Sequence, residues 1–248
     1  MFSLEIECEE ARRDWLLAEL YDFEPAGVVE LDARRVRVFF EDTADRAQLL
    51  ARYPAALLRQ EEDRDWVSEA RAMLQPMLVG SRFFLTPEWR DDPAPEGRFR
   101  IAVNPGMAFG TGVHETTQLC LEALEKFVQP GAAVLDVGTG QGILARAARL
   151  LGAAKVVACD IDPVAIEIAG MGFIGSVDAV RSYSVDLVVA NISPEAIVKL
   201  APEFLRVRRG GGTILASGFE VTEIEKVRSV LPAVREVRQK RNWALAVA

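Results

Sequence analysis

The chain has 248 residues, of which 50% are hydrophobic and 27% charged, and its formal net charge is −8. This composition can bury a sizeable core. No apolar run reaches the roughly 18 residues of a membrane span. The negative charge disfavours tight nonspecific contact with nucleic acid. With three widely spaced cysteines and one histidine, we expect no metal site, no disulfide framework, and reduced thiols in a cytoplasmic protein.

The first 60 or so residues follow a β-α-β-β-α-β order, which predicts a small ferredoxin-like α+β domain over residues 1–62. The expected elements are Phe2–Cys8, Glu10–Phe23, Gly27–Leu31, Val36–Phe40, Thr43–Arg52 and Ala56–Gln60. The N-terminus itself, MFSLEIECEE, is acidic and alternates apolar with polar residues. We therefore expect a strand there and neither a signal nor a transit peptide.

Residues 63–98 are predicted to form a linker helix and a loop. The helix is expected over Asp65–Met77, and prolines and glycines then punctuate the chain as far as Gly97. Such punctuation is typical of a loop-rich stretch with short strands.

From residue 99 to residue 248 the pattern changes to near-continuous apolar strands that alternate with helices. The expected strands are Val134–Val137, Val156–Asp160, Asp186–Ala190, Thr213–Ala216 and an edge strand at Trp243–Val247. The expected helices are Ile143–Leu151, Glu195–Val207 and Val221–Leu231. This alternation predicts a doubly wound α/β domain with a largely parallel sheet covered on both faces.

A glycine-rich turn, Gly138-Thr139-Gly140-Gln141-Gly142, joins a strand to a helix. Glycines let the backbone turn tightly and approach a ligand closely, and such ligands lie at the carboxyl ends of the strands. Asp160 ends the next strand, about twenty residues on, where a carboxylate can accept hydrogen bonds from both ribose hydroxyls. Asp162, which precedes Pro163, is better explained as a helix N-cap.

Two kinds of cofactor fit this turn. A dinucleotide needs its pyrophosphate on the helix N-terminus, usually with the spacing G-x-G-x-x-G. S-adenosylmethionine has no phosphate, and the spacing G-x-G-x-G after Asp136 favours it. A glycine turn alone is weak evidence for either cofactor.

The segment Asn104–Thr117 reads NPGMAFGTGVHETT and leads into a helix that begins near His114. A run with three glycines is costly in chain entropy, so a plain linker is a poor explanation. The helix start offers hydroxyls and unpaired backbone N–H groups to a carboxylate or another polar ligand.

This segment, followed by VLDVGTGQGILA, CDIDP and VVANI, resembles the PrmA family of methyltransferases that act on protein eleven of the large ribosomal subunit. The resemblance covers nearly the whole chain. It implies a class I Rossmann-like methyltransferase domain behind a small domain that docks the free ribosomal protein, with S-adenosyl-L-methionine as cofactor. It also implies methyl transfer to lysine side chains and to the N-terminal amine. We expect a cytoplasmic monomer without direct contact to nucleic acid or membrane.

The resemblance places Phe109 and Gly110 over the methionine end of the cofactor and implies contacts from Thr117, Gly138, Asp160 and Asn191. The full set of predicted cofactor contacts is Phe109, Gly110, Thr116, Thr117, Asp136, Gly138, Gly140, Asp160, Asp178 and Asn191. Asp178 is a candidate contact to the adenine amino group, and a solvated loop carboxylate is an equal alternative.

Two residues are candidates for the catalytic step, in which a lysine must first lose its proton from a pKa near 10.4. Asn191 could orient the amine or hold the methionine tail. His114 could accept a proton, although a residue that shapes the start of the helix is the simpler interpretation. Asn191-Ile192-Ser193-Pro194 stands where methyltransferases of planar amides and bases resemble one another in an NPPY-like motif, and this difference favours an alkyl amine.

The stretch between Pro163 and Asp186 is shorter than is usual in the family. Either the protein has a real deletion here, or residues are missing from the chain at this point. Because both flanks match the family well, we expect missing residues.

Other functions are compatible with parts of the pattern. A class I methyltransferase with another protein or a small-molecule substrate would use the same glycine turn. A nicotinamide-dependent oxidoreductase would bind a pyrophosphate there. A non-catalytic cofactor-binding module would be consistent with the short stretch after Ala169.

Overall fold

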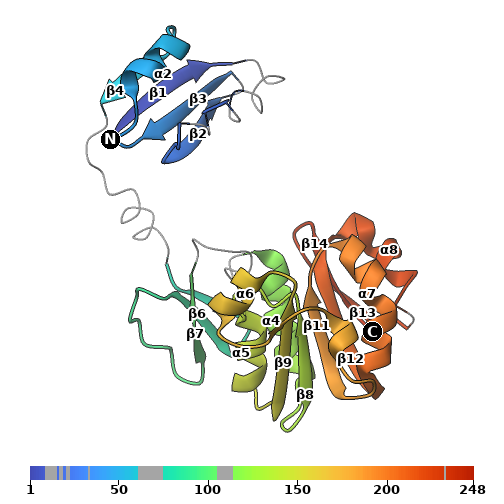
Figure 1. Ribbon diagram of the computed structural model, residues 1–248. Coiled ribbons are helices and arrows are strands. Elements are labelled where there is room, and N and C mark those ends of the chain that lie inside the picture. Colours follow the sequence, from blue (N-terminus) through green and yellow to red (C-terminus); the bar gives the residue numbers. More distant parts are fainter. Residues whose placement is uncertain are drawn as a thin grey trace. The chain divides into compact units, whose positions relative to one another are not determined.

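The computed structural model describes residues 1–8, 16, 19–20, 23–32, 34–60, 75–104, 114–231 and 233–248 (Figure 1). The chain divides into two compact units, Met1–Met73 and Leu74–Ala248. The predicted linker helix falls almost entirely on residues outside the described ranges. The part of the predicted loop that is described, residues 75–98, belongs to the second unit.

The first unit contains a four-stranded antiparallel sheet in the order β2-β3-β1-β4. Its elements are β1 (Phe2–Glu7), β2 (Gly27–Asp32), β3 (Arg35–Phe40), helix α2 (Arg46–Arg52) and β4 (Leu57–Gln60). The sheet order interleaves the two halves of the predicted β-α-β-β-α-β arrangement. Asp45 begins α2, because its side chain accepts a hydrogen bond from the backbone N–H of Gln48 at 3.0 Å.

One face of this sheet is apolar because its inward residues alternate along β1 and β3. Phe2, Leu4 and Ile6 alternate with outward residues on β1, and Val36, Val38 and Phe40 do the same on β3; all six are buried. The predicted helix Glu10–Phe23 lies mostly on residues that the structure does not describe. Of its described residues, Leu20 is helical and fully buried in the same core.

The second unit is built on a seven-stranded sheet in the order β10-β9-β8-β11-β12-β14-β13 (Figure 1). The strands β10, β9, β8, β11 and β12 are parallel to one another. Strand β14 is antiparallel to both β12 and β13. The strands are β8 (Ala133–Val137), β9 (Lys155–Asp160), β10 (Phe173–Ile174), β11 (Val185–Asn191), β12 (Arg208–Glu220), β13 (Glu236–Lys240) and β14 (Trp243–Val247). The predicted doubly wound α/β fold is confirmed.

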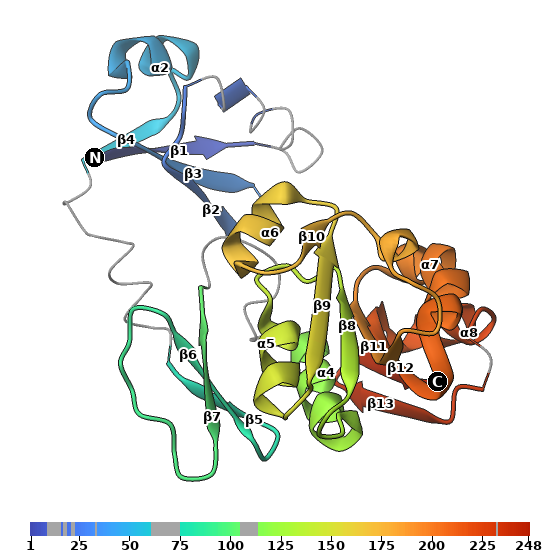
Figure 2. The same cartoon turned by 60° about the horizontal axis from the view of Figure 1, so that its bottom comes forward.

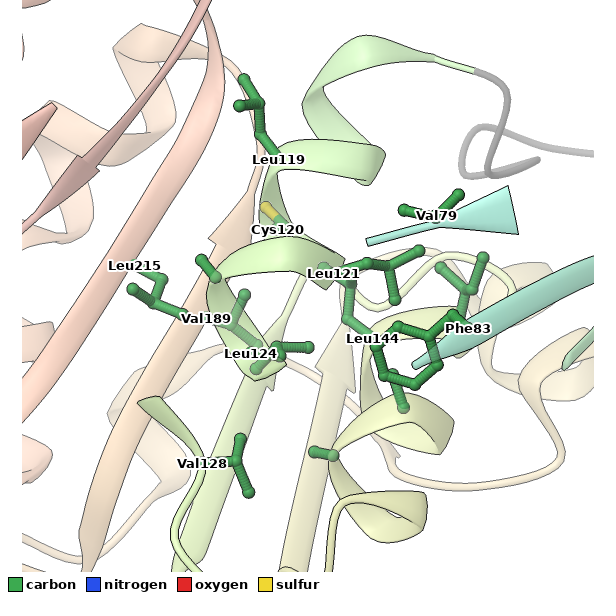
Figure 3. Packing of buried hydrophobic residues seen from close by; sticks show 14 of the residues in the cluster. Val79, Phe83, Leu119, Cys120, Leu121, Leu124, Val128, Leu144, Val189 and Leu215 are labelled. Atoms are coloured by element: carbon green, nitrogen blue, oxygen red, sulfur yellow. The ribbon is translucent and has the colours of Figure 1, made fainter. Parts of the chain in front are cut away.

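Helices cover both faces of this sheet, which explains why its central strands are almost continuously apolar. On β11, Val189 packs with helices α4 (Glu115–Phe127) and α5 (Ile143–Leu150), whereas its neighbour Val188 packs with helices α7 (Pro194–Val207) and α8 (Ile224–Arg228). Figure 3 shows the first of these two layers, in which α4 places Leu121 and Leu124 over the sheet.

A second, three-stranded sheet in the order β5-β6-β7 packs against α4 and α5. It consists of β5 (Met77–Val79), β6 (Phe83–Pro87) and β7 (Phe99–Val103), and β6 and β7 are parallel. Phe83, Leu85 and Ile101 are buried in the same cluster as Leu121 and Leu144 (Figure 3). The short strands expected in this loop-rich stretch are therefore present, and they contribute to the core of the second unit.

The structure spans the full 248-residue sequence, so the expectation of residues missing between Pro163 and Asp186 is wrong. Helix α6 (Pro163–Ala169) has only seven residues and ends at Gly170 in the left-handed conformation. The chain then forms β10, a two-residue edge strand beside β9, and a 3₁₀ helix at Val177–Ala179 (Figure 2).

Arg206 on α7 holds this short crossing in place. Its guanidinium donates hydrogen bonds to the backbone oxygens of Val177 at 3.0 Å and Val180 at 2.8 Å, and it pairs with Glu203 at 2.6 Å. A single side chain therefore satisfies two backbone carbonyl oxygens of the crossing. Among the described residues, no helix combines the length and apolarity needed to cross a bilayer.

We expect Arg206→Ala to lower the free energy of unfolding by about 1–3 kcal/mol, because it leaves several carbonyl oxygens of the crossing without donors. Urea denaturation followed by circular dichroism measures the change. Arg228→Ala is the matched control, since among the described residues Arg228 makes only a surface pair with Glu225, and it should change the value by less than about 0.5 kcal/mol. Equal effects of the two variants would contradict the assigned role of Arg206.

Candidate functional site

The glycine-rich turn follows β8 at the carboxyl end of the parallel strands. Gly138, Gly140 and Gly142 all have positive φ angles, of 68°, 51° and 77°, which only glycine adopts readily. The backbone N–H groups of Gly138 and Thr139 donate to the carbonyl oxygen of Cys159 on β9, at 2.9 and 3.1 Å. A Cβ atom at Gly138 would lie 2.4 Å from the side chain of Ile192, so glycine is required here by packing as well as by conformation.

Asp160 lies beside this turn, as its place at the end of β9 predicts. Its carboxylate accepts hydrogen bonds from the backbone N–H groups of Gly140 at 2.9 Å and Asp162 at 3.1 Å, one on each oxygen. Each carboxylate oxygen can accept a further hydrogen bond. The side chain is therefore held in one orientation while it keeps acceptor capacity for a ligand. Asp162 caps α6 instead, since its side chain accepts from Val164 N at 2.9 Å.

Asp136 is fully buried at the end of β8. One carboxylate oxygen accepts hydrogen bonds from the Thr139 hydroxyl at 2.6 Å and the Ala145 backbone N–H at 3.0 Å. The other oxygen, Oδ1, has no hydrogen-bond partner among the described residues. Burial raises the pKa of Asp136 to about 6, with a smaller contribution from the nearby charge of Asp160 and opposing contributions from the two hydrogen bonds.

Asn191 and Thr117 meet at the same rim. Asn191 ends β11, and its side-chain N–H donates to the Thr117 hydroxyl oxygen at 3.2 Å. Thr117, in the first turn of α4, is only 2% exposed. The contact fixes the orientation of the Asn191 amide, so that its carbonyl oxygen remains as an acceptor.

His114 lies at the N-terminus of helix α4 and contacts Thr116 in the first turn of the helix. Its Nδ1 accepts the backbone N–H of Thr116 at 3.3 Å and lies 2.7 Å from the Thr116 hydroxyl, so the ring acts as the N-cap. The ring also packs edge-on against Trp243, with 4.5 Å between the ring centroids. These contacts occupy Nδ1 and the Thr116 side chain. They agree with the helix-start interpretation, whereas a role for His114 as proton acceptor stays a prediction.

Of the remaining predicted site residues, Asp178 is the one that the structure describes. Asp178 is exposed, in the 3₁₀ helix after β10, and its charge is close enough to Cys159 to contribute to the raised pKa of that thiol. No described contact joins Asp178 to Asp160. Phe109 and Gly110 lie outside the described residues, as does most of the NPGMAFGTG segment.

Three residues of this rim are missing from the sequence-based prediction. Ile161 and Ile174 flank Asp160 and remain 80% and 61% exposed, and Ile174 is the parallel β partner of Asp160. Gln141, inside the turn, is 2% exposed and binds the backbone of Asn104. Large apolar residues next to a strand-end carboxylate are a signal that could have been used for Ile161. Nothing in the sequence pairs Gln141 with Asn104.

Two buried thiols lie in the same unit. Burial raises the pKa of Cys159 to about 12 and that of Cys120 further. Neither is a thiolate near neutral pH, and so neither is a suitable nucleophile. Within the described part of the chain, no group of three or more metal-binding side chains is found.

Comparison with known proteins shows which family shares these features. The family model described as "Ribosomal protein L11 methyltransferase (PrmA)" matches residues 32–247. The ribosomal protein L11 methyltransferase of Symbiobacterium thermophilum is 38% identical over 239 residues, covering 90% of this chain and 77% of that protein. A crystal structure of ribosomal protein L11 methylase from Lactobacillus delbrueckii subsp. bulgaricus is similar with a TM-score of 0.64 and 30% identity, covering 71% of this chain and 98% of that chain.

The ribosomal protein L11 methyltransferase of Burkholderia pseudomallei is 34% identical over 264 residues, covering 97% of this chain and 88% of that protein. The matched region is longer than the 248 residues of the whole chain. The relative therefore has residues within the matched region that have no counterpart in this chain.

The raised pKa of Asp136 predicts a pH dependence of stability. Its pKa rises from an ordinary value of 3.8 to about 6 on folding, so its contribution to stability is fully present below about pH 4 and is lost as the pH rises through about 6. An asparagine at position 136 does not ionise, so the Asp136→Asn variant does not lose this stability as the pH rises. Between about pH 4 and pH 7 the unfolding free energy of the variant should therefore gain about 2 kcal/mol relative to the wild type. Urea denaturation across this range checks it, and parallel curves for the two proteins would contradict it.

Proposed function

Because the chain belongs to the ribosomal protein L11 methyltransferase family, we propose that it transfers methyl groups from S-adenosylmethionine to lysine side chains and the N-terminal amine of ribosomal protein L11. Membership makes the chain an S-adenosylmethionine-dependent protein methyltransferase that modifies L11, and the amine targets are the proposal. The proposed function is supported above all by one observation. The glycine turn, Asp160 and the Thr117–Asn191 pair lie at the same rim of the sheet.

The residues of the turn fit this cofactor. Among the described residues no donor reaches the buried Asp136 Oδ1, and a cationic amino group is the donor that best compensates a buried carboxylate. The carboxylate of Asp160 keeps acceptor capacity for two ribose hydroxyls. Asp136, Gly138, Gly140 and Asp160 would hold the cofactor, which when bound supplies an electrophilic methyl group on a sulfonium.

The adenine ring needs an apolar surface next to the ribose. Ile161 and Ile174 offer one, because each has most of its side chain exposed on either side of Asp160. Burying such a side chain removes apolar surface from water at about 25 cal/mol per Å². Asp178 remains a candidate for the adenine amino group, since it follows β10 directly in the chain.

Asn191 is the residue best placed to receive the acceptor amine. Thr117 holds its side-chain nitrogen, so its carbonyl oxygen can accept an N–H from a lysine and point the nitrogen lone pair away from itself. A neutral amine is required, and a pocket from which water is excluded lowers the pKa of a lysine. His114 remains a candidate proton acceptor only at Nδ1, because a neutral ring that accepts the Thr116 N–H at Nδ1 carries its proton on Nε2. The absence of an NPPY-like motif at Asn191-Ile192-Ser193-Pro194 supports an alkyl amine as substrate.

The first unit is proposed to dock L11, and the enzyme is proposed to act as a cytoplasmic monomer, because its substrate is a free ribosomal protein. Family membership excludes the nicotinamide-dependent oxidoreductase. The non-catalytic alternative depended on the short stretch after Ala169, and in the structure this stretch is a compact crossing fixed by Arg206.

Asp160 and Asp162 form a matched pair for testing the cofactor site. We expect Asp160→Ala to weaken S-adenosylmethionine binding by about 1–3 kcal/mol, because it leaves the ribose hydroxyls and the Gly140 N–H without an acceptor. Asp162→Ala removes a helix cap and should cost about 1 kcal/mol of stability with little change in binding. Isothermal titration calorimetry measures the cofactor affinity of both variants, and urea denaturation measures the stability of Asp162→Ala. An unchanged affinity in Asp160→Ala would remove Asp160 from the site.

Intact mass spectrometry tests the proposed reaction directly. The protein is mixed with S-adenosylmethionine and unmethylated L11, and successive mass increments of one methylene should appear on L11. Peptide mapping should locate them on lysine side chains and the N-terminal amine. With Asn191→Ala we expect the increments to slow by about one to two orders of magnitude, because positioning of the amine is lost. Increments confined to other residue types would contradict the amine assignment.

A further inference from the structure

Gln141 occupies the centre of the glycine turn, yet its side chain does not point to solvent. The residue is 2% exposed, and its amide binds the backbone of Asn104, 37 residues earlier in the chain. The Asn104 N–H donates to Gln141 Oε1 at 3.1 Å, and Gln141 Nε2 donates to the Asn104 carbonyl oxygen at 2.7 Å. Both ends of the side-chain amide are therefore used on one residue.

This two-way contact imitates a pair of residues in a β ladder. In a hydrogen-bonded antiparallel pair, one residue also donates its N–H and accepts at its C=O from the same neighbour. Asn104 directly follows β7, which has only β6 as a neighbour among the described strands, and the Gln141 amide takes the place of a second neighbour. Because Gln141 is buried, breaking the contact would leave polar groups without partners.

The contact joins two parts of the second unit that are far apart in sequence. The Asn104 side chain donates to Glu88 Oε1 at 2.6 Å, and Glu88 N–H donates to the Val103 carbonyl oxygen at 2.9 Å. Asn104 is thus tied on one side to the residue after β6 and on the other side to the turn.

Arg146 reinforces the same connection from the first turn of α5. Its guanidinium reaches the Ala102 carbonyl oxygen on β7 at 3.5 Å. The group is half-buried, burial lowers its pKa, and its Nε has no described hydrogen-bond partner. Gln141 and Arg146 therefore both direct polar groups from the region of the turn to the end of β7.

We propose that Gln141 is a positioning residue for methyl transfer, which fixes the carboxyl end of β7 against the cofactor turn so that the two move as one piece. This inference rests on the proposed function, namely that the turn binds S-adenosylmethionine. Gly140 and Gly142 flank Gln141, and the Gly140 N–H is the group that orients Asp160. A displaced Gln141 therefore disturbs Asp160 without touching the cofactor.

The Gln141→Leu variant separates positioning from stability when it is compared with Thr86→Val. Leucine keeps most of the volume but removes both hydrogen bonds. Thr86 is a fully buried residue of β6 whose side chain makes, among the described residues, one long hydrogen bond, to the Pro87 carbonyl oxygen at 3.5 Å. For both variants, calorimetry gives the cofactor Kd, methylation of L11 gives kcat and KM, and thermal unfolding gives Tm.

We expect Gln141→Leu to raise the cofactor Kd about tenfold and to lower kcat/KM at least as much, a change of about 1.4 kcal/mol. Thr86→Val should leave both within about twofold even if its Tm falls. A Gln141→Leu enzyme with a lowered Tm but wild-type Kd and kcat overturns the inference and leaves the proposed function standing. Failure of the wild-type protein to bind S-adenosylmethionine overturns the proposed function, and the inference with it.

Gln141→Glu provides a second, independent readout through its pH profile. The ionised glutamate only accepts hydrogen bonds and faces the Asn104 carbonyl oxygen, whereas the protonated form regains a donor. The ratio of variant to wild-type Kd should therefore fall toward one as the pH is lowered from about 8 to about 5. The charged groups around the contact, Glu88, Asp136, Arg146 and Asp160, are common to both proteins, so their effect on binding largely cancels in the ratio. A ratio that does not change with pH contradicts the role of the Gln141 donor.

Discussion

The second unit depends on one buried carboxylate, that of Asp136. It receives the hydroxyl of Thr139 from the turn and the backbone N–H of Ala145 from helix α5, so it holds the strand, the turn and the helix start in one arrangement. Burying a charge is costly unless it is paired and hydrogen-bonded, and the raised pKa of Asp136 measures the part of this cost that the two hydrogen bonds do not offset. The same turn carries the left-handed glycines, contacts Cys159 and orients Asp160.

Much of the fold and part of the candidate site could be predicted from the sequence, for reasons that differ between residues. The strands around Val137 and Val189 are predictable because burial on both faces makes them continuously apolar. The turn and Asp160 are predictable because glycine spacing and a strand-end carboxylate have few other uses. The partners of Gln141 and Arg206 were not predictable, since each binds backbone atoms distant in sequence, and any residue offers a backbone carbonyl. The packing of β5, β6 and β7 was missed because prolines and glycines around them indicate loops equally well.

The shortened crossing illustrates how a chain can lose residues without losing a sheet. An edge strand needs a neighbour on one side only, so two residues of β10 are enough to continue the parallel order beside β9. The interior of the crossing is then stabilised from α7, through Arg206, and not by a long helix of its own. The exposed Ile161 and Ile174 stay at this edge, which concentrates apolar surface where a flat ring would bind.

The two buried thiols have a practical consequence. Cys120 and Cys159 lie on opposite layers of the same sheet, in separate clusters of the core, and both are protonated and inaccessible in the folded unit. Alkylating reagents can reach them only when the layer above each one opens. The labelling rate of each thiol therefore reports the opening of its own layer. The rates at which the two are labelled would tell whether the faces of the sheet come apart together or one after the other.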